Sequence, residues 1–289
     1  MLKKLYKRIA GSKSHSLSPI ETYLKGNRKP WSRGYEEYKA MMIEKSINDI
    51  GLLDDMSEGI LPKGYGLRLD ERIVEYAWIF SKLHNGQEKL LDAGSTFNFE
   101  FIVNHPCVQE KTVDICTYYP EENCFHRNGI SYLFSDLRNL PYRDNLFDTV
   151  VSQSTIEHID MDNSIYGYEV DNSSVSETKS YDYLNATSEL IRIVKPQGKL
   201  LLTFPFGKFE NHGFFQQFDL EMMEKILEQV ENQGTYSLHF FKYEKDGWRF
   251  ASANELDGVE SYNPHTGRGK GDDGAAHCRS ICCLEFRKN

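Results

Sequence analysis

A short apolar run that ends in an acid and a glycine, KLLDAGSTFNFE at residues 89–100, constrains the fold of this chain most. Leu90 and Leu91 are followed at once by Asp92 and Gly94, which is typical of a buried strand that ends in a tight turn. In an open α/β sheet, ligands bind in the crevice outside the carboxyl ends of the strands. A nucleotide-like cofactor is therefore expected at this turn, although ordinary strand-to-helix turns carry the same residues.

Three segments further along the chain repeat this pattern of a strand followed by a polar turn. They are residues 131–136, which end at Asp136, residues 149–155, which end with Gln153, Ser154 and Thr155, and residues 196–204, in which a Pro-Gln-Gly turn precedes the strand. Strands that alternate with helical stretches predict a parallel sheet.

Taken together, residues 89–207 resemble a class I S-adenosylmethionine (SAM) dependent methyltransferase of the common small-molecule type. The resemblance implies an α/β fold with a Rossmann-like, seven-stranded, mostly parallel sheet, an antiparallel C-terminal hairpin and N-terminal covering helices. The alternating segments 236–250 and 277–286 suit that hairpin.

The expected division is an N-terminal tail and helical cap at residues 1–84 and a methyltransferase domain at residues 85–289. A long polar span at residues 160–183 is expected to be a substrate lid, because loops of this length inside a compact domain usually have a function.

The resemblance also implies which residues hold SAM. Asp136 and Leu137 match the family's contacts to the adenine edge, and Thr117 stands where the family has an acid that grips the ribose hydroxyls. The first turn departs from the family, which usually has three spaced glycines, so close backbone approach to a ligand depends on Gly94. The full set predicted to bind the cofactor is Asp92, Gly94, Ser95, Thr117, Asp136, Leu137, Gln153 and Ser154.

Methyl transfer from a sulfonium requires alignment of the acceptor and, for a hydroxyl acceptor, removal of a proton. Histidine titrates near neutral pH, and His158 and His212 both follow strand ends on the edge where the cofactor is expected. Both are therefore predicted as candidate catalytic bases, with a packed structural histidine as the alternative for each.

Residues predicted to bind the substrate flank this edge: Arg68, Glu71, Phe215 and Gln216. Aromatic residues expected near the mouth of the site suit the apolar faces of a sugar; they are Tyr65, Phe214, Phe215 and Trp248. The chain also resembles methyltransferases of bacterial surface-glycan gene clusters, which implies carbohydrate biosynthesis with a sugar or glycan-precursor hydroxyl as acceptor. The alternatives are a catalytically inactive partner-binding module of the same fold and a methyltransferase for another small metabolite.

Charge and composition limit the kinds of partner that the chain can bind. The formal net charge of −9 disfavours nucleic acid, and no apolar segment approaches the roughly 18 residues of a spanning helix. Six cysteines without C-x-x-C spacing predict reduced thiols in a cytoplasmic protein and no metal ligands, with a metal site as the alternative. Basic and apolar residues within 1–9 leave peripheral contact with anionic lipid open.

Overall fold

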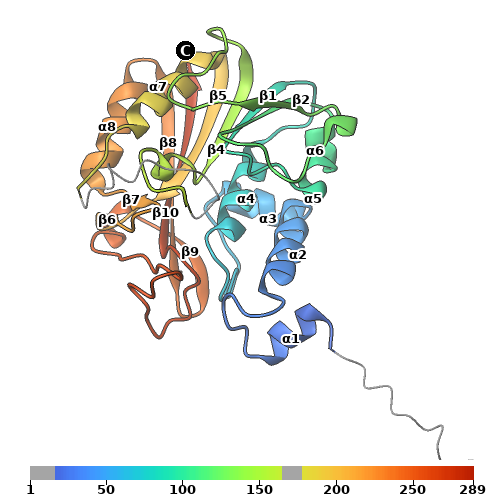
Figure 1. Cartoon of the computed structure of the whole chain (residues 1–289), viewed down its shortest axis with the longest axis vertical. Coiled ribbons are helices and arrows are strands. Elements are labelled where there is room, and N and C mark those ends of the chain that lie inside the picture. The colour runs from blue at the N-terminus through green and yellow to red at the C-terminus, as the bar shows by residue number, and fades with distance from the viewer. Residues whose placement is uncertain (1–16, 165–177) are drawn as a thin grey trace, which may run out of the picture.

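The structure is a computed structural model that describes residues 17–164 and 178–289. The expected lipid contact at residues 1–9 and most of the expected lid lie outside these described residues. Figure 1 shows a central sheet with helices on either side. The helices of four or more residues are α1 (Pro19–Lys25), α2 (Tyr35–Ile47), α3 (Ile50–Ser57), α4 (Arg72–Lys82), α5 (Glu100–Val103), α6 (Pro106–Gln109), α7 (Tyr183–Ile193) and α8 (Leu220–Glu231).

Within the described residues, the main sheet has eight strands in the order β3-β2-β1-β4-β5-β10-β8-β9. The first five are parallel: β3 (Ser131–Phe134), β2 (Thr112–Thr117), β1 (Lys89–Ala93), β4 (Phe147–Gln153) and β5 (Val194–Pro205). The last three are antiparallel to their neighbours: β10 (Ser280–Lys288), β8 (Gly234–Glu244) and β9 (Gly247–Ala251). A separate small pair is β6 (Glu210–Asn211) with β7 (Gln216–Gln217).

This arrangement confirms the Rossmann-like, mostly parallel sheet and corrects the expected number of strands. Residues 236–250 are not one strand of a hairpin with β10, because the chain turns between Glu244 and Gly247 and makes β8 and β9. Gly247 has φ of +117°, which L-residues with a side chain rarely adopt. β10 lies between β5 and β8, and β9 is the additional, eighth strand at the edge of the sheet.

The sheet is buried on both faces by two separate apolar cores. One core contains residues of α1–α4, α5 and α6, and the other contains residues of α7 and α8. Leu90 belongs to the first core and Leu91 to the second, and both are fully buried. The adjacent leucines of β1 therefore face opposite ways, as successive residues of a strand must.

Helix α4 is buried on every side from Ile73 to Phe80, because α2 and α3 cover the face turned away from the sheet. The apolar core that contains α4 also contains residues of the sheet strands. The division of the chain at residue 84 remains a prediction. Among the described residues, no helix has both the length and the apolar character needed to cross a membrane.

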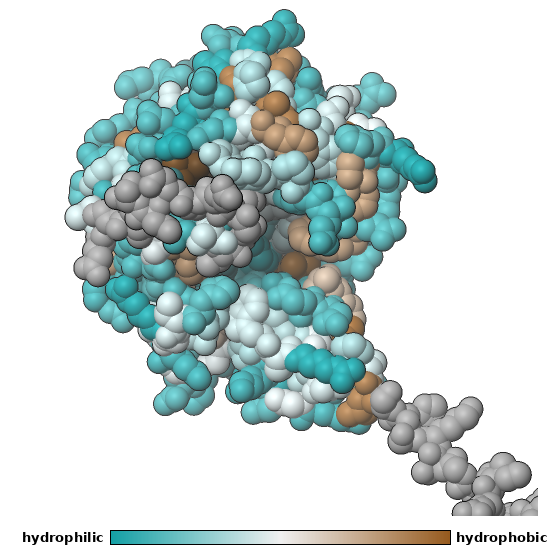
Figure 2. Space-filling view, viewed as in Figure 1, coloured by the Kyte–Doolittle hydropathy of each residue, from teal (hydrophilic) through white to brown (hydrophobic). Residues whose placement is uncertain are grey.

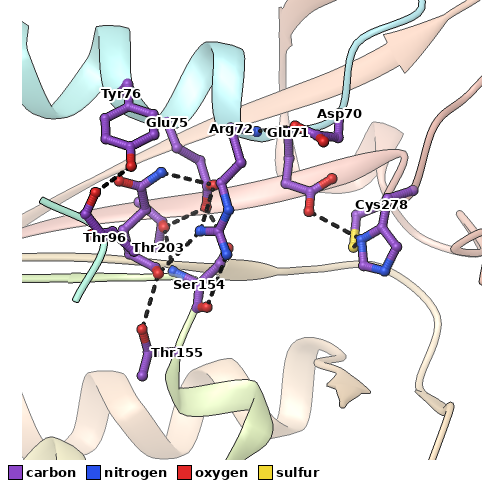
Figure 3. Close-up of polar contacts among 12 residues, drawn as sticks. Asp70, Glu71, Arg72, Glu75, Tyr76, Thr96, Ser154, Thr155, Thr203 and Cys278 are labelled. Carbon is purple, nitrogen blue, oxygen red and sulfur yellow. Dashed lines mark hydrogen bonds and ion pairs between the residues drawn. The ribbon is translucent and has the colours of Figure 1, made fainter. Parts of the chain in front are cut away.

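A buried carboxylate fixes α4 to the sheet (Figure 3). Glu75 is fully buried, and the hydroxyl groups of Ser154 and Thr203 donate hydrogen bonds to its Oε1. Its Oε2 accepts from Gln153 Nε2 and from Arg72 Nη1, each at 3.3 Å. One side chain of α4 thereby joins the carboxyl ends of β4 and β5.

Replacing Glu75 with alanine should lower the free energy of unfolding by about 3 kcal/mol, because it leaves several buried donors and the charge of Arg72 without their acceptor. Urea unfolding followed by circular dichroism measures this loss. Glu37→Ala is the matched control, since Glu37 is exposed on α2, and should change stability by less than about 0.5 kcal/mol. Equal stability of both variants would contradict a role for Glu75 in holding α4.

Candidate active site

A cavity of about 530 Å³ lies at the carboxyl edge of the parallel strands. Its wall is made by the turns that follow β1, β2, β3 and β4, together with Arg72 from α4. The visible surface is mostly hydrophilic and is hollowed between the upper and lower parts of the molecule (Figure 2). Six residues predicted to bind cofactor line this cavity: Gly94, Ser95, Thr117, Asp136, Leu137 and Ser154.

Asp92 and Gln153, also predicted to bind cofactor, do not line the cavity and are fully buried. The carboxylate of Asp92 accepts hydrogen bonds from Phe97 N at 2.7 Å and from the N and Oγ1 of Thr96 at 3.3 and 3.1 Å. Burial raises the pKa of Asp92 to about 7. Asp92 therefore shapes the turn after β1 from within.

Gly94 lets this turn pack against the turn after β4. Its φ is +131°, and a Cβ there would lie 2.0 Å from Oγ1 of Thr155. Gly94 was expected to allow close approach of a ligand, and it does line the cavity. The structure adds a second reason for glycine here: any side chain at this position would clash with Thr155.

Glu121 is a carboxylate of the cavity wall that the sequence analysis did not select. It accepts hydrogen bonds from Ser95 Oγ, from Asn98 Nδ2 at 2.6 Å and from Thr117 Oγ1 at 3.4 Å. The chain thus does carry an acid beyond the end of β2, four residues after Thr117. The signal was present in the sequence, but the bend that returns Glu121 to Ser95 could not be read from it.

Asp136, at the end of β3, is held by Arg138. Arg138 donates to its carboxylate from the backbone N at 2.8 Å, from Nε at 3.1 Å and from Nη2 at 2.8 Å. Burial opposes ionisation of Asp136, but the hydrogen bonds from Arg138 outweigh it and hold the pKa below its usual value. Nη1 of Arg138 also donates to Asp182 at 2.6 Å, so Arg138 links the cavity wall to the start of α7.

Arg72, from α4, is another charged residue of the cavity wall that was not predicted from the sequence. It donates from Nη1 to the carbonyl oxygen of Gln153 at 3.1 Å and from Nη2 to that of Ser154 at 3.4 Å (Figure 3). These contacts fix the backbone where β4 enters the cavity wall. Arg68 and Glu71 were predicted from this part of the sequence, but Arg72 is the residue that lines the cavity.

The two candidate bases lie in different surroundings. His158 lines the cavity, with 19% of its side chain exposed, and its Nδ1 lies 2.6 Å from the carbonyl oxygen of Phe214. The side chain of His212 is fully buried outside the cavity wall, and its ring is stacked on Phe215 at 4.5 Å. Burial lowers the pKa of each histidine to about 4.

None of the four residues predicted to bind substrate lines the cavity. Arg68 donates to the carbonyl oxygen of Asn27, Glu71 pairs with His277, and Phe215 is fully buried. The side-chain amide of Gln216 accepts from the backbone N of Ser180 through Oε1 and donates to its carbonyl oxygen through Nε2.

The aromatic residues expected at the mouth of the site do not line the cavity either. All four are buried, because the helices before β1 and the C-terminal strands pack on them: Tyr65, Phe214, Phe215 and Trp248. Tyr118, at the end of β2, is the aromatic residue of the cavity wall.

Residues 101–202 match the family model described as a methyltransferase domain. These residues therefore carry a methyltransferase domain, and the protein is a SAM-dependent methyltransferase with SAM as its cofactor. None of the curated proteins compared with the sequence matches it.

The chain resembles many solved structures, including the following two. A SAM-dependent methyltransferase from Thermotoga maritima is 13% identical, with a TM-score of 0.44, and the match covers 86% of this chain and 99% of that one. The 1,6-didemethyltoxoflavin-N1-methyltransferase from Burkholderia thailandensis, with bound 1,6-didemethyltoxoflavin and S-adenosylhomocysteine, is 11% identical, with a TM-score of 0.43 and coverage of 88% and 90%.

The residues of the cavity fit SAM. Its volume lies within the usual range for ligand pockets, about 300–1,000 Å³. Glu121 and Asp136 offer carboxylate oxygens at the ends of neighbouring strands, where hydroxyl and amino groups of a nucleoside need acceptors. We infer that Glu121 holds the ribose and that Asp136 and Leu137 hold the adenine.

Glu121→Gln should weaken SAM binding by about 1.5–3 kcal/mol, because a charged acceptor is replaced by a neutral amide. Isothermal calorimetry measures the change. Glu122→Gln is the matched control, because Glu122 is the exposed neighbour and does not line the cavity. If both variants bound SAM like the wild type, Glu121 would have no part in the cofactor site.

Asp136→Ala should also weaken SAM binding by about 1.5–3 kcal/mol, through loss of a charge-assisted hydrogen bond. Asp182→Ala is the comparison variant, because it removes the hydrogen bond from Arg138 Nη1 to Asp182 and leaves the Asp136 carboxylate in place. An equal loss of affinity in both variants, measured by calorimetry, would mean that Asp136 acts only through Arg138.

Proposed function

We propose that the protein transfers the methyl group of SAM to a hydroxyl group of a small-molecule acceptor, a sugar or glycan precursor. The observation that carries this proposal is the hydrogen bond between His158 Nδ1 and the carbonyl oxygen of Phe214 at the cavity wall. A carbonyl oxygen only accepts, so Nδ1 carries the ring proton and Nε2 is the basic nitrogen. A hydroxyl acceptor needs such a base.

The surroundings keep the ring of His158 neutral and fix its orientation. Because burial lowers its pKa to about 4, the ring is neutral at physiological pH. The ring of Phe214 stacks on it at 6.0 Å, which together with the hydrogen bond fixes its orientation. SAM supplies an electrophilic methyl group on its sulfonium; His158 takes the hydroxyl proton at Nε2 as the acceptor oxygen is methylated.

Polar residues beside His158 support a hydroxyl-rich acceptor. Arg138, Asp160 and Asn163 line the cavity, and they offer both donors and acceptors of hydrogen bonds. Tyr118 adds an aromatic face of the kind on which sugar rings pack. The free thiols of all six cysteines support a reducing, cytoplasmic setting.

His158→Gln should lower turnover roughly 10²- to 10⁴-fold while leaving SAM affinity unchanged. Transfer of a labelled methyl group to a mixture of nucleotide sugars, read by mass spectrometry, measures turnover and identifies the acceptor. His212→Gln is the control, because His212 is the other candidate and lies outside the cavity wall. A folded and fully active His158→Gln protein would exclude His158 as the base.

The pH dependence gives a second readout of the same base. Protonation removes the basic nitrogen, so the rate should stay constant down to about pH 5 and fall as the pH approaches 4. A fall with a midpoint near 6.5 would instead indicate an exposed base. Labelling of another small metabolite, but not of sugars, would refute the carbohydrate acceptor, and absence of SAM binding would indicate an inactive module of the same fold.

A further inference from the structure

Three side chains of the kinds that bind metals converge outside the cavity wall: Glu71, His277 and Cys278. Nδ1 of His277 lies 3.0 Å from Oε1 of Glu71 and 3.1 Å from Sγ of Cys278. One potential ligand atom from each residue lies within 4.8 Å of the other two. Figure 3 shows Glu71 directed toward Cys278, while Arg72 points the other way, toward Ser154.

Hydrogen bonding alone does not satisfy this cluster. Nδ1 of His277 carries at most one proton: with it, the ring donates to the Glu71 carboxylate and cannot accept from the thiol. Without it, the ring accepts from the thiol and its lone pair faces the carboxylate. The other carboxylate oxygen, Oε2 of Glu71, is buried and has no hydrogen-bond partner among the described residues. Such unsatisfied groups in a buried site are costly.

We propose that Glu71, His277 and Cys278 bind one divalent transition-metal ion, with Zn²⁺ as the ion that fits best. A thiolate, an imidazole nitrogen and a carboxylate oxygen are the ligand types that Zn²⁺ takes, whereas Mg²⁺ and Ca²⁺ prefer oxygen alone. Oε2 of Glu71 or a water molecule completes four ligands. On binding, the thiol proton leaves to solvent and the ring of His277 carries its proton on Nε2.

Charge and surroundings favour this site. One carboxylate and one thiolate neutralise a divalent cation, so the occupied site carries no net charge, which suits a buried position. The ring of Phe215 lies 4.9 Å from that of His277, and an apolar covering of this kind limits access of water.

The site ties together distant parts of the chain. Glu71 directly precedes α4, and His277 and Cys278 come just before β10. A bound ion would hold the first turn of α4, which carries Arg72, against the C-terminal part of the sheet. This role is structural, because none of the three ligands lines the cavity.

The test uses the full chain, purified without a histidine tag. Mass spectrometry of the metal content should find close to one zinc per chain, and Co²⁺ added to the metal-free protein should give a thiolate-to-cobalt absorption band. Cys278→Ser should abolish that band and weaken the metal at least roughly tenfold, and Glu71→Gln should weaken the metal but keep the band. Cys124→Ser removes the exposed thiol and is the control that should change neither.

A wild-type chain that binds SAM, and so is folded, but takes up neither Zn²⁺ nor Co²⁺ would overturn the proposal. This measurement needs no variant, so it decides the question even if Cys278→Ser fails to fold. Loss of the cobalt band in Cys124→Ser, or its retention in Cys278→Ser, would place the metal elsewhere and would equally refute this site.

Discussion

The position of α4 against the sheet depends on the buried carboxylate of Glu75. Without its donors, an ionised carboxylate in the core is strongly unfavourable, so Ser154, Thr203, Gln153 and Arg72 must all be in place together. These residues come from α4 and from the ends of β4 and β5. The same contacts that satisfy one charge therefore align a helix with the two strand ends next to the cavity.

The strands and helices could largely be predicted from the sequence because their signals are local. Leu90 and Leu91, followed by Asp92 and Gly94, do form a strand and a turn at the centre of the sheet. Asp219, a residue type that favours the position before a helix, caps α8 by accepting a hydrogen bond from the backbone N of Met222. The extra strand was missed because residues 236–250 alternate without a break, and only the turn before Gly247 divides them.

The candidate site could be predicted less completely, because it depends on where loop side chains point. His158 and His212 both follow strand ends, yet one faces the cavity and the other is stacked beneath Phe215. Glu121 follows Thr117 by four residues of irregular backbone, and no periodic pattern describes such a segment. Position at a strand end therefore indicated the correct edge of the sheet, but it could not separate wall residues from those packed behind them.

The two ends of β10 lie at opposite edges of the sheet, and only one of them is near the cavity. Because β10 runs antiparallel to β5, Ser280 lies at the edge of the sheet that carries the cavity, and Lys288 lies at the opposite edge. A fluorophore, surface tether or fused protein attached after Asn289 would therefore lie at this opposite edge, away from the cavity. The Lys288 end of β10 is thus a favourable point for immobilising this methyltransferase while leaving its cofactor and acceptor free to enter.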